Sequence, residues 1–316
     1  MIKTVVGSYP VLKKQQPQNF KEKVLNKLGL FDRFKKSMDR AIEAQLESGI
    51  DIISDGQVRG DMVDIFTSQM YGFDGKKVID KIEFLKPITL KDLKYTNEYV
   101  KSKNPNVGVK GILTGACTIA SSIRVEKYYS DNKDENLIMD LARALNKEAL
   151  AIQNYVKVIQ IDEPILSTGL YDMKIAKKAV DEITKSLSVP IAIHVCGNVK
   201  DIFEDLNEFN VDILDHEFAS NKGNLDILES CRKKIGFGCI NTKLKTIDPV
   251  DNVKELLYEG IEILKQNPYI NDDLDSNIII DPDCGMRLLP ESVAFGKLKN
   301  MVIATEEIEK ELFNKK

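Results

Sequence analysis

A histidine and a cysteine with metal-binding chemistry lie two residues apart in this sequence. The segment IAIHVCGNV, residues 191–199, contains His194 and Cys196 at the point where an apolar run ends in glycine. His194 is one of only two histidines in the 316-residue chain. Imidazole nitrogen and cysteine thiolate are ligands that suit Zn²⁺, so the pair predicts metal ligation at the end of a buried strand.

Other polar side chains also stand where apolar runs end. Glu217 follows VDILDH and Cys284 follows NIIIDPD, and further cases are Ser8, Asp55, Cys117, Asp162, Glu163 and Cys239. Taken singly, each has an ordinary interpretation, since cysteine is often buried and a strand-end glutamate often caps or pairs. Their coincidence on several strand ends favours a zinc site whose ligands are His194, Cys196, Glu217 and Cys284.

The ligand set leaves an alternative open. Cys117 and Cys239 occupy similar positions in the chain, so either could replace Glu217 or Cys284 as a ligand. His216 is expected to point away from the site, because side chains alternate along a strand.

Three charged residues nearby have two interpretations, and a fourth has one. The segment DGQVRGDMV adds Asp55, Arg59 and Asp61, which either lie at the site or cap the following helix and pair with one another. Glu163 precedes Pro164 and is expected to turn away from the metal.

Short β-branched runs alternate with amphipathic helical segments along the chain. Eight strands are predicted, at 2–8, 50–56, 107–115, 156–164, 190–197, 211–218, 234–241 and 277–285. This pattern predicts an α/β fold, a single (β/α)8 TIM barrel over residues 1–316, with an extra antiparallel strand or hairpin around 78–90. An open doubly wound sheet is the alternative. In a barrel the carboxyl ends of all strands form one mouth, where the polar residues would converge.

Composition narrows the partners to small molecules. The formal net charge is -4 and the lysines are scattered, whereas a nucleic-acid surface needs a basic face. No signal segment and no apolar run of membrane-spanning length is present, so a cytoplasmic enzyme is expected. Five irregularly placed cysteines do not suggest a disulfide framework.

Several motifs, in order along nearly the whole chain, resemble one family. HVCG, the glutamate in LDHEF, and DPDCGMR together resemble the catalytic barrel of cobalamin-independent methionine synthase. VVGSYP, SDGQVRGDMV, VKGILTGACT and VIQIDEPIL are similar to that family's first four strand motifs. The family's separate N-terminal barrel is missing, so the chain resembles its short, single-barrel members.

The resemblance implies a role for each matching residue. It implies that the four ligands above hold zinc and that homocysteine binds beside them. Ser8, with the backbone of Val6 and Gly7, would lie along the substrate carboxylate, and Asp162 would accept hydrogen bonds from its ammonium group. Gln57 stands where the family usually has glutamate, which removes one charge from that site. A zinc-bound thiol is deprotonated, and the resulting thiolate can attack a methyl group.

Two departures from the family concern the methyl donor. Asn241 stands at the position assigned to the folate-using enzymes' histidine, and the chain has no tryptophan to stack on a folate ring. Transfer from a tetrahydrofolate requires protonation of the departing nitrogen, whereas a methyl-cobalt corrinoid departs without a proton. The expected donor is therefore methylcobalamin or another methylated corrinoid, presented by a corrinoid protein.

Several alternatives remain at this point. Methyltetrahydrofolate could be the donor, or a small thiol without an amino acid group could be the acceptor. A metal-free barrel of the uroporphyrinogen decarboxylase type would leave the cysteines without a purpose, and a zinc hydrolase commonly needs more histidines. A non-catalytic zinc barrel acting as a binding module represents a different class.

Overall fold

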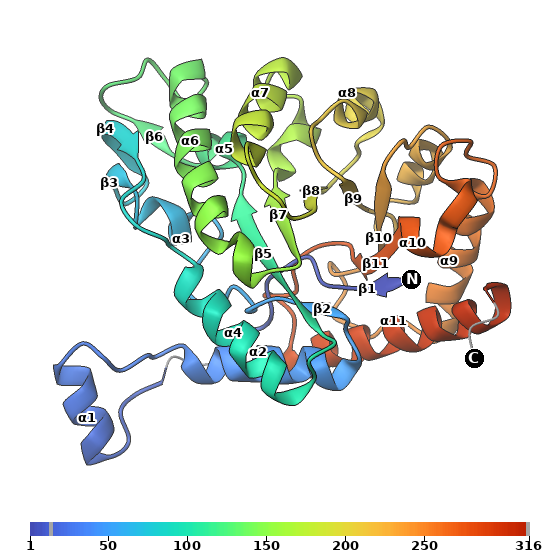
Figure 1. Ribbon diagram of the computed structural model, residues 1–316, viewed down its shortest axis with the longest axis horizontal. Coiled ribbons are helices and arrows are strands. Elements are labelled where there is room, and N and C mark those ends of the chain that lie inside the picture. The colour runs from blue at the N-terminus through green and yellow to red at the C-terminus, as the bar shows by residue number, and fades with distance from the viewer. Residues whose placement is uncertain (13–14, 314–316) are drawn as a thin grey trace.

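Eight parallel strands form a barrel in the computed structural model, which describes residues 1–12 and 15–313 (Figure 1). The strands are β1 (Ile2–Lys3), β2 (Ile52–Ile53), β5 (Gly108–Thr114), β7 (Val158–Asp162), β8 (Ile191–Val195), β9 (Ile213–Glu217), β10 (Lys234–Ile240) and β11 (Ile278–Pro282). They are hydrogen-bonded in the order β1-β11-β10-β9-β8-β7-β5-β2, and a parallel bridge from Thr4 to Ile52 joins the two edge strands. The predicted barrel is confirmed, and the open sheet is wrong.

Helices surround this barrel. They are α1 (Phe20–Lys27), α2 (Lys35–Ser48), α3 (Asp64–Thr67), α4 (Leu90–Lys103), α5 (Ala116–Ser121), α6 (Glu135–Ile152), α7 (Met173–Thr184), α8 (Phe203–Asn207), α9 (Val250–Leu264), α10 (Leu274–Asn277) and α11 (Glu291–Leu312). Short 3₁₀ helices lie at Gln153–Tyr155, Pro164–Thr168, Lys200–Ile202, Lys222–Glu229 and Asn271–Asp273. Helix α2 buries Met38, Ala41 and Ile42 and ends at Gly49, whose φ of 87° only glycine adopts readily. Helix α1 stands away from the barrel (Figure 1).

The extra hairpin begins earlier than predicted. Strands β3 (Tyr71–Asp74) and β4 (Lys77–Glu83) pair antiparallel, and β6 (Arg124–Val125) adds a parallel partner to β4. The extra antiparallel strand predicted around 78–90 is confirmed as β4, which ends at Glu83, earlier than the predicted segment. Pro87 cannot donate to a strand ladder. The amides of Ile88 and Thr89 donate instead to the buried Glu148 carboxylate, at 2.7 and 2.8 Å, and the chain then enters α4.

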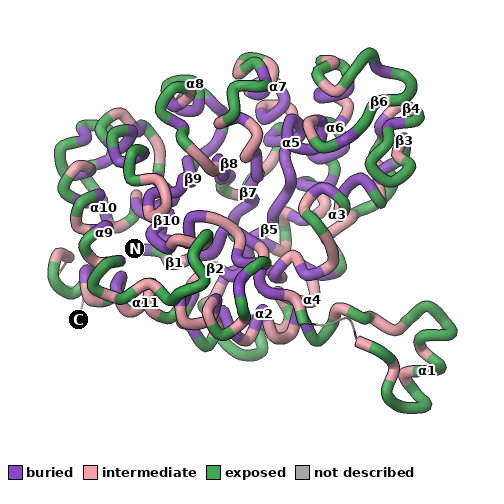
Figure 2. Tube along the Cα trace, turned by 180° about the vertical axis from the view of Figure 1, so that it is seen from behind, coloured by how far each residue is buried: buried purple, intermediate pink, exposed green. Residues whose placement is uncertain are grey.

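The central strands are buried on both faces, between the barrel interior and the surrounding helices (Figure 2). A small cluster of Val158, Ala192, Ile213 and Ile279 fills the barrel at the end opposite the mouth, because these residues begin their strands. On the helix side, Phe237 stacks on Phe218 with ring centroids 4.3 Å apart. A Cβ atom at Gly260 of α9 would lie 2.3 Å from the Phe237 ring, so glycine allows this close packing.

Among the described residues, no helix has the length and apolar character needed to cross a bilayer. That residues 1–316 form one domain stays a prediction, and its last residues, 314–316, lie outside the described part.

Replacing Phe237 with alanine tests the packing between strand and helix. Phe237→Ala is expected to lower the free energy of unfolding by about 3–5 kcal/mol, because the cavity lies between two rigid elements. Urea denaturation followed by circular dichroism measures this loss. Leu288→Ala is the control: Leu288 is 89% exposed, so a change within about 0.5 kcal/mol is expected. Equal effects of both substitutions would contradict this description of the core.

Candidate metal and substrate site

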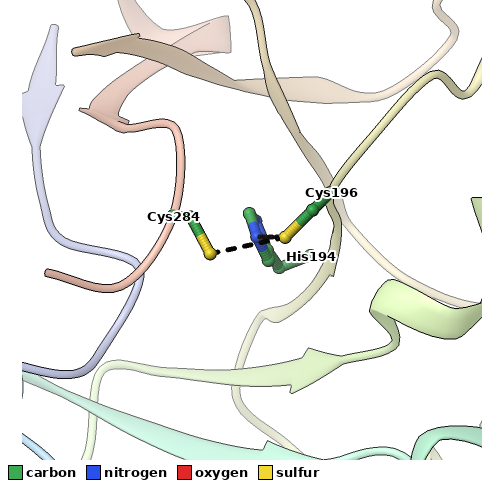
Figure 3. Close-up of side chains that lie close together, drawn as sticks. All are labelled: His194, Cys196 and Cys284. Atoms are coloured by element: carbon green, nitrogen blue, oxygen red, sulfur yellow. Dashed lines mark hydrogen bonds between the residues drawn. The ribbon is translucent and has the colours of Figure 1, made fainter. Parts of the chain in front are cut away.

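Three metal-binding side chains meet at the mouth of the barrel. His194 lies on β8, Cys196 follows that strand, and Cys284 follows β11 (Figure 3). The His194 Nε2 atom is 2.9 Å from Cys196 Sγ, which is 3.5 Å from Cys284 Sγ. All three ligand atoms lie within 4.8 Å of one another, and both thiols are free. Residues 88 positions apart in the sequence thus form one cluster.

This cluster fits a zinc ion. Zn–S bonds of about 2.3 Å and Zn–N bonds of about 2.0 Å place the ligands of a tetrahedral ion roughly 3.5–3.8 Å apart. The sulfur–sulfur distance of 3.5 Å is at the edge of this range, and the nitrogen–sulfur distance of 2.9 Å is shorter by an amount that a side-chain rotation removes. Two thiolates and an imidazole are the ligand types that zinc prefers.

Neighbouring groups shift the pKa values of two of these three residues. The hydrogen bond from Cys196 holds the pKa of Cys284 well below its usual range, although burial acts in the opposite direction. Burial lowers the pKa of His194, but the facing Cys196 and Asp215 outweigh it, so that pKa is raised.

Asp215 was not predicted, and it lies where it can orient the histidine ring. Its Oδ1 is 3.2 Å from His194 Nδ1, and the two residues are direct partners in the β8–β9 register. Carboxylate partners of this kind fix the tautomer of metal-binding histidines. A signal was present in the sequence, because Asp215 and Glu217 are two residues apart on one strand and therefore share a face.

Glu217 lies apart from the cluster of three. Its side chain is 2% exposed at the end of β9, and Oε1 accepts a hydrogen bond of 3.1 Å from Lys243 Nζ. The structure thus brings together His194, Cys196 and Cys284, while the fourth predicted ligand has a lysine partner. Lys243 was not predicted, because it lies on an irregular loop after β10 whose path the sequence does not define.

The alternative ligands lie elsewhere. Cys117 is buried in α5 and Cys239 is buried in β10, and burial raises the pKa of both thiols. Neither belongs to the metal-binding group found among the described residues.

Two residues expected to point away from the metal do so. The Glu163 carboxylate accepts hydrogen bonds from the amides of Cys117 and Thr118 at the start of α5. The His216 ring packs edge-to-face on Phe203, and burial lowers its pKa to about 4.

Two of the predicted substrate residues, Ser8 and Asp162, lie next to residues of the cluster or their neighbours, and Gln57 lies next to Gly7. Gln57 Oε1 lies so close to Gly7 that an added Cβ there would be 2.9 Å away, and Ser8 Oγ lies beside Gly285. Asp162 is the register partner of His194, and burial raises its pKa to about 7. The role of these residues in binding an amino acid stays a prediction.

Gln160 links two of these groups. Its Nε2 donates to the Val6 carbonyl at 2.8 Å and to Asp162 Oδ1 at 2.7 Å. Lys110 Nζ donates to Gln160 Oε1 at 2.6 Å, so the amide cannot turn away. Sequence analysis did not identify Gln160, although it precedes Asp162 by two residues on the same strand and thus shares its face.

The loop that contains Gln57 is held from two sides. Gln57 has a φ of 45°, and its carbonyl accepts a hydrogen bond from Arg287, the last residue of DPDCGMR. Arg59 forms ion pairs with Asp32 and Asp92, and a cavity of about 360 Å³ lies between this loop and α4.

The predicted pairing among Asp55, Arg59 and Asp61 is wrong, because Arg59 has other partners. Asp61 does not cap α3, whose N-cap is Val63; its carboxylate accepts the Val63 amide in the turn before the helix. Asp55 accepts the Gln57 amide instead.

Asn241 shapes the loop after β10. Its side-chain oxygen accepts the backbone N–H of Lys243 at 2.9 Å, and its own carbonyl accepts from the buried Lys297. An amide has no acidic proton to donate, and its catalytic role stays a prediction.

Comparison with known proteins places the chain in a family. The sequence model described as "Cobalamin-independent synthase, Catalytic domain" matches residues 1–307. A methionine synthase from Methanocaldococcus jannaschii is 61% identical over 308 residues, which cover 98% of this chain and 99% of that protein. One from Methanothermobacter thermautotrophicus is 40% identical and covers 96% and 99%.

A B12-independent methionine synthase from a Shewanella species, solved with selenomethionine, has a similar fold. Its TM-score is 0.82 at 21% identity, with 99% of each chain covered. The family model and the methionine synthase that is 61% identical identify the chain as a methyltransferase. The chain belongs to the cobalamin-independent methionine synthase family, as its catalytic domain. The non-catalytic, decarboxylase and hydrolase alternatives are therefore wrong.

Two cysteine substitutions test the metal site. Cys284→Ser removes a direct ligand and is expected to weaken Zn²⁺ binding more than roughly 100-fold. Losing only a residue that hydrogen-bonds a ligand typically costs about 10- to 100-fold. Cys239→Ala removes a more deeply buried thiol outside the cluster, and this variant should bind zinc like the wild type. Competition with a chromophoric chelator measures both affinities. A large loss in Cys239→Ala with none in Cys284→Ser would refute the assignment.

Proposed function

We propose that this enzyme transfers a methyl group from a methylated corrinoid to homocysteine, at a zinc ion held by His194, Cys196 and Cys284 with Glu217 as an exchangeable ligand. The cluster of one imidazole and two thiols within 4.8 Å, beside the buried Asp162, is the observation that carries the proposal. The 61% identity to a methionine synthase supports the product. The proposal places the reaction in the cytosol, where free thiols stay reduced.

The chemistry needs a thiolate and a fixed substrate. Bound zinc supplies the thiolate, since a metal-bound thiol is deprotonated at neutral pH. The backbone of Val6 and Gly7, with Ser8, lies along the substrate carboxylate, and Asp162 accepts hydrogen bonds from the ammonium group. The Gln57 side chain lies against Gly7 and therefore restricts the space in which the substrate can contact that backbone segment. Holding the thiolate in line with the donor methyl lowers the barrier further.

The choice of donor rests on what the departing group requires. A corrinoid leaves without a proton, and neither Asn241 nor any tryptophan supplies the acid or stacking platform that a folate needs. Methylcobalamin, or a partner protein that presents a methylated corrinoid, meets the requirement with the residues present.

Methyltetrahydrofolate is the second candidate donor, and two observations favour it. The family is described as cobalamin-independent. In addition, the ammonium group of Lys243 lies at the mouth, 3.1 Å from Glu217, where it is a source of a proton. The two donors must therefore be compared directly.

A four-arm assay of zinc-loaded protein tests the proposal. Methylcobalamin and methyltetrahydrofolate are each offered with homocysteine or with mercaptoethanesulfonate, and methylated thiol is quantified by mass spectrometry. Methionine from methylcobalamin alone, lost in Cys284→Ser, is expected. Mercaptoethanesulfonate should react poorly, because it offers no ammonium group to Asp162. Methionine from the folate alone would overturn the donor, and preferential methylation of mercaptoethanesulfonate would overturn the acceptor.

A further inference from the structure

Lys243 lies at the metal site without belonging to any predicted set of ligands or substrate residues. It follows β10 on the loop from Asn241 to Pro249, and its side chain is 61% exposed. The Nζ atom nevertheless reaches inward to Glu217, whose side chain is 2% exposed. A long cationic side chain thus extends from solvent to a buried carboxylate.

Glu217 lies near a second buried carboxylate, so a neighbouring cation is needed to balance its charge. Asp283 is a second buried carboxylate nearby, and its oxygens are committed to the backbone amides of Phe218, Ala219 and Ser220. A buried carboxylate without a cation is costly, so Glu217 requires either a metal ion or Lys243.

The loop geometry presets the position of the lysine. The Lys243 amide donates to Asn241 Oδ1 at 2.9 Å, and the Asn241 amide donates to Asp248. The buried Lys297 donates to the Asn241 carbonyl and pairs with Asp248. The backbone at Lys243 is therefore fixed, and only its side chain must be ordered to reach Glu217.

We infer that Lys243 is a positioning residue that holds Glu217 when this carboxylate is released from the metal. Glu217 then alternates between two cations, the zinc ion and the Lys243 ammonium group. An incoming thiol takes the ligand position of Glu217, and Lys243 stabilises the carboxylate that leaves. This inference rests on the proposed function and deepens it, because it names the residue that controls the exchange.

The inference predicts two opposite changes in one variant. In Lys243→Met, zinc alone should bind roughly three- to tenfold more tightly, because Glu217 loses its competing partner. Homocysteine should bind the metal-loaded variant more weakly by a similar factor, because the released carboxylate stays unpaired. Chelator competition without thiol measures the first change, and the d–d spectrum of the Co²⁺-substituted protein, titrated with homocysteine, measures the second.

Three controls isolate the contact. Lys243→Arg should retain both wild-type affinities, and Lys245→Met, an exposed lysine of the same loop, should change neither. In a Glu217→Gln background, Lys243→Met should have no further effect, since the carboxylate it serves is absent.

The outcomes separate this inference from the function it rests on. Opposite shifts in the two affinities that vanish in the Glu217→Gln background support it. If the wild type binds zinc and methylates homocysteine, but Lys243→Met leaves both affinities unchanged or weakens both equally, the inference alone is overturned. A wild type that binds no zinc overturns the proposed function and this inference together.

Discussion

Parallel pairing of neighbouring strands is the constraint on which the site depends. Register places Asp162 of β7 beside His194 of β8, and His194 beside Asp215 of β9. A shift of one residue in either ladder would turn these side chains to the helix side, because the side-chain period of a strand is two. The register that holds the barrel together therefore also selects which side chains face the mouth.

The mouth concentrates buried carboxylates, and its charge balance follows from them. Burial raises the pKa of Asp162 to about 7 and raises that of Asp281 well above its usual range. Lys110 is the buried cation beneath them, and it donates to the Val5 carbonyl and to Gln160. A metal dication and a substrate ammonium group would both stabilise the ionised carboxylates, so the site is electrostatically suited to the two partners proposed for it.

Much of this arrangement could be predicted from the sequence, because strand ends and residue chemistry are local signals. His194, Cys196 and Cys284 each follow an apolar run, and barrel closure brings them together. The first strand is shorter than predicted, because β1 ends at Lys3 and, after the bridge at Thr4, Val6, Gly7 and Ser8 lie outside the strand ladder.

Features that depend on loop paths could not be predicted. Lys243 reaches Glu217 only because Asn241 and Lys297 fix the loop after β10. Arg287 likewise donates a hydrogen bond to the carbonyl of Gln57, which is 230 residues away in the sequence. Such contacts follow from tertiary packing and leave no periodic signal.

The claim at the centre of this account is that zinc, two thiolates and an exchangeable carboxylate activate the substrate thiol. Zinc K-edge X-ray absorption of the metal-loaded enzyme, with and without homocysteine, tests it most directly. The account predicts two sulfur ligands in the free enzyme and three after homocysteine binds, with one oxygen ligand lost. A coordination shell that homocysteine leaves unchanged would contradict it.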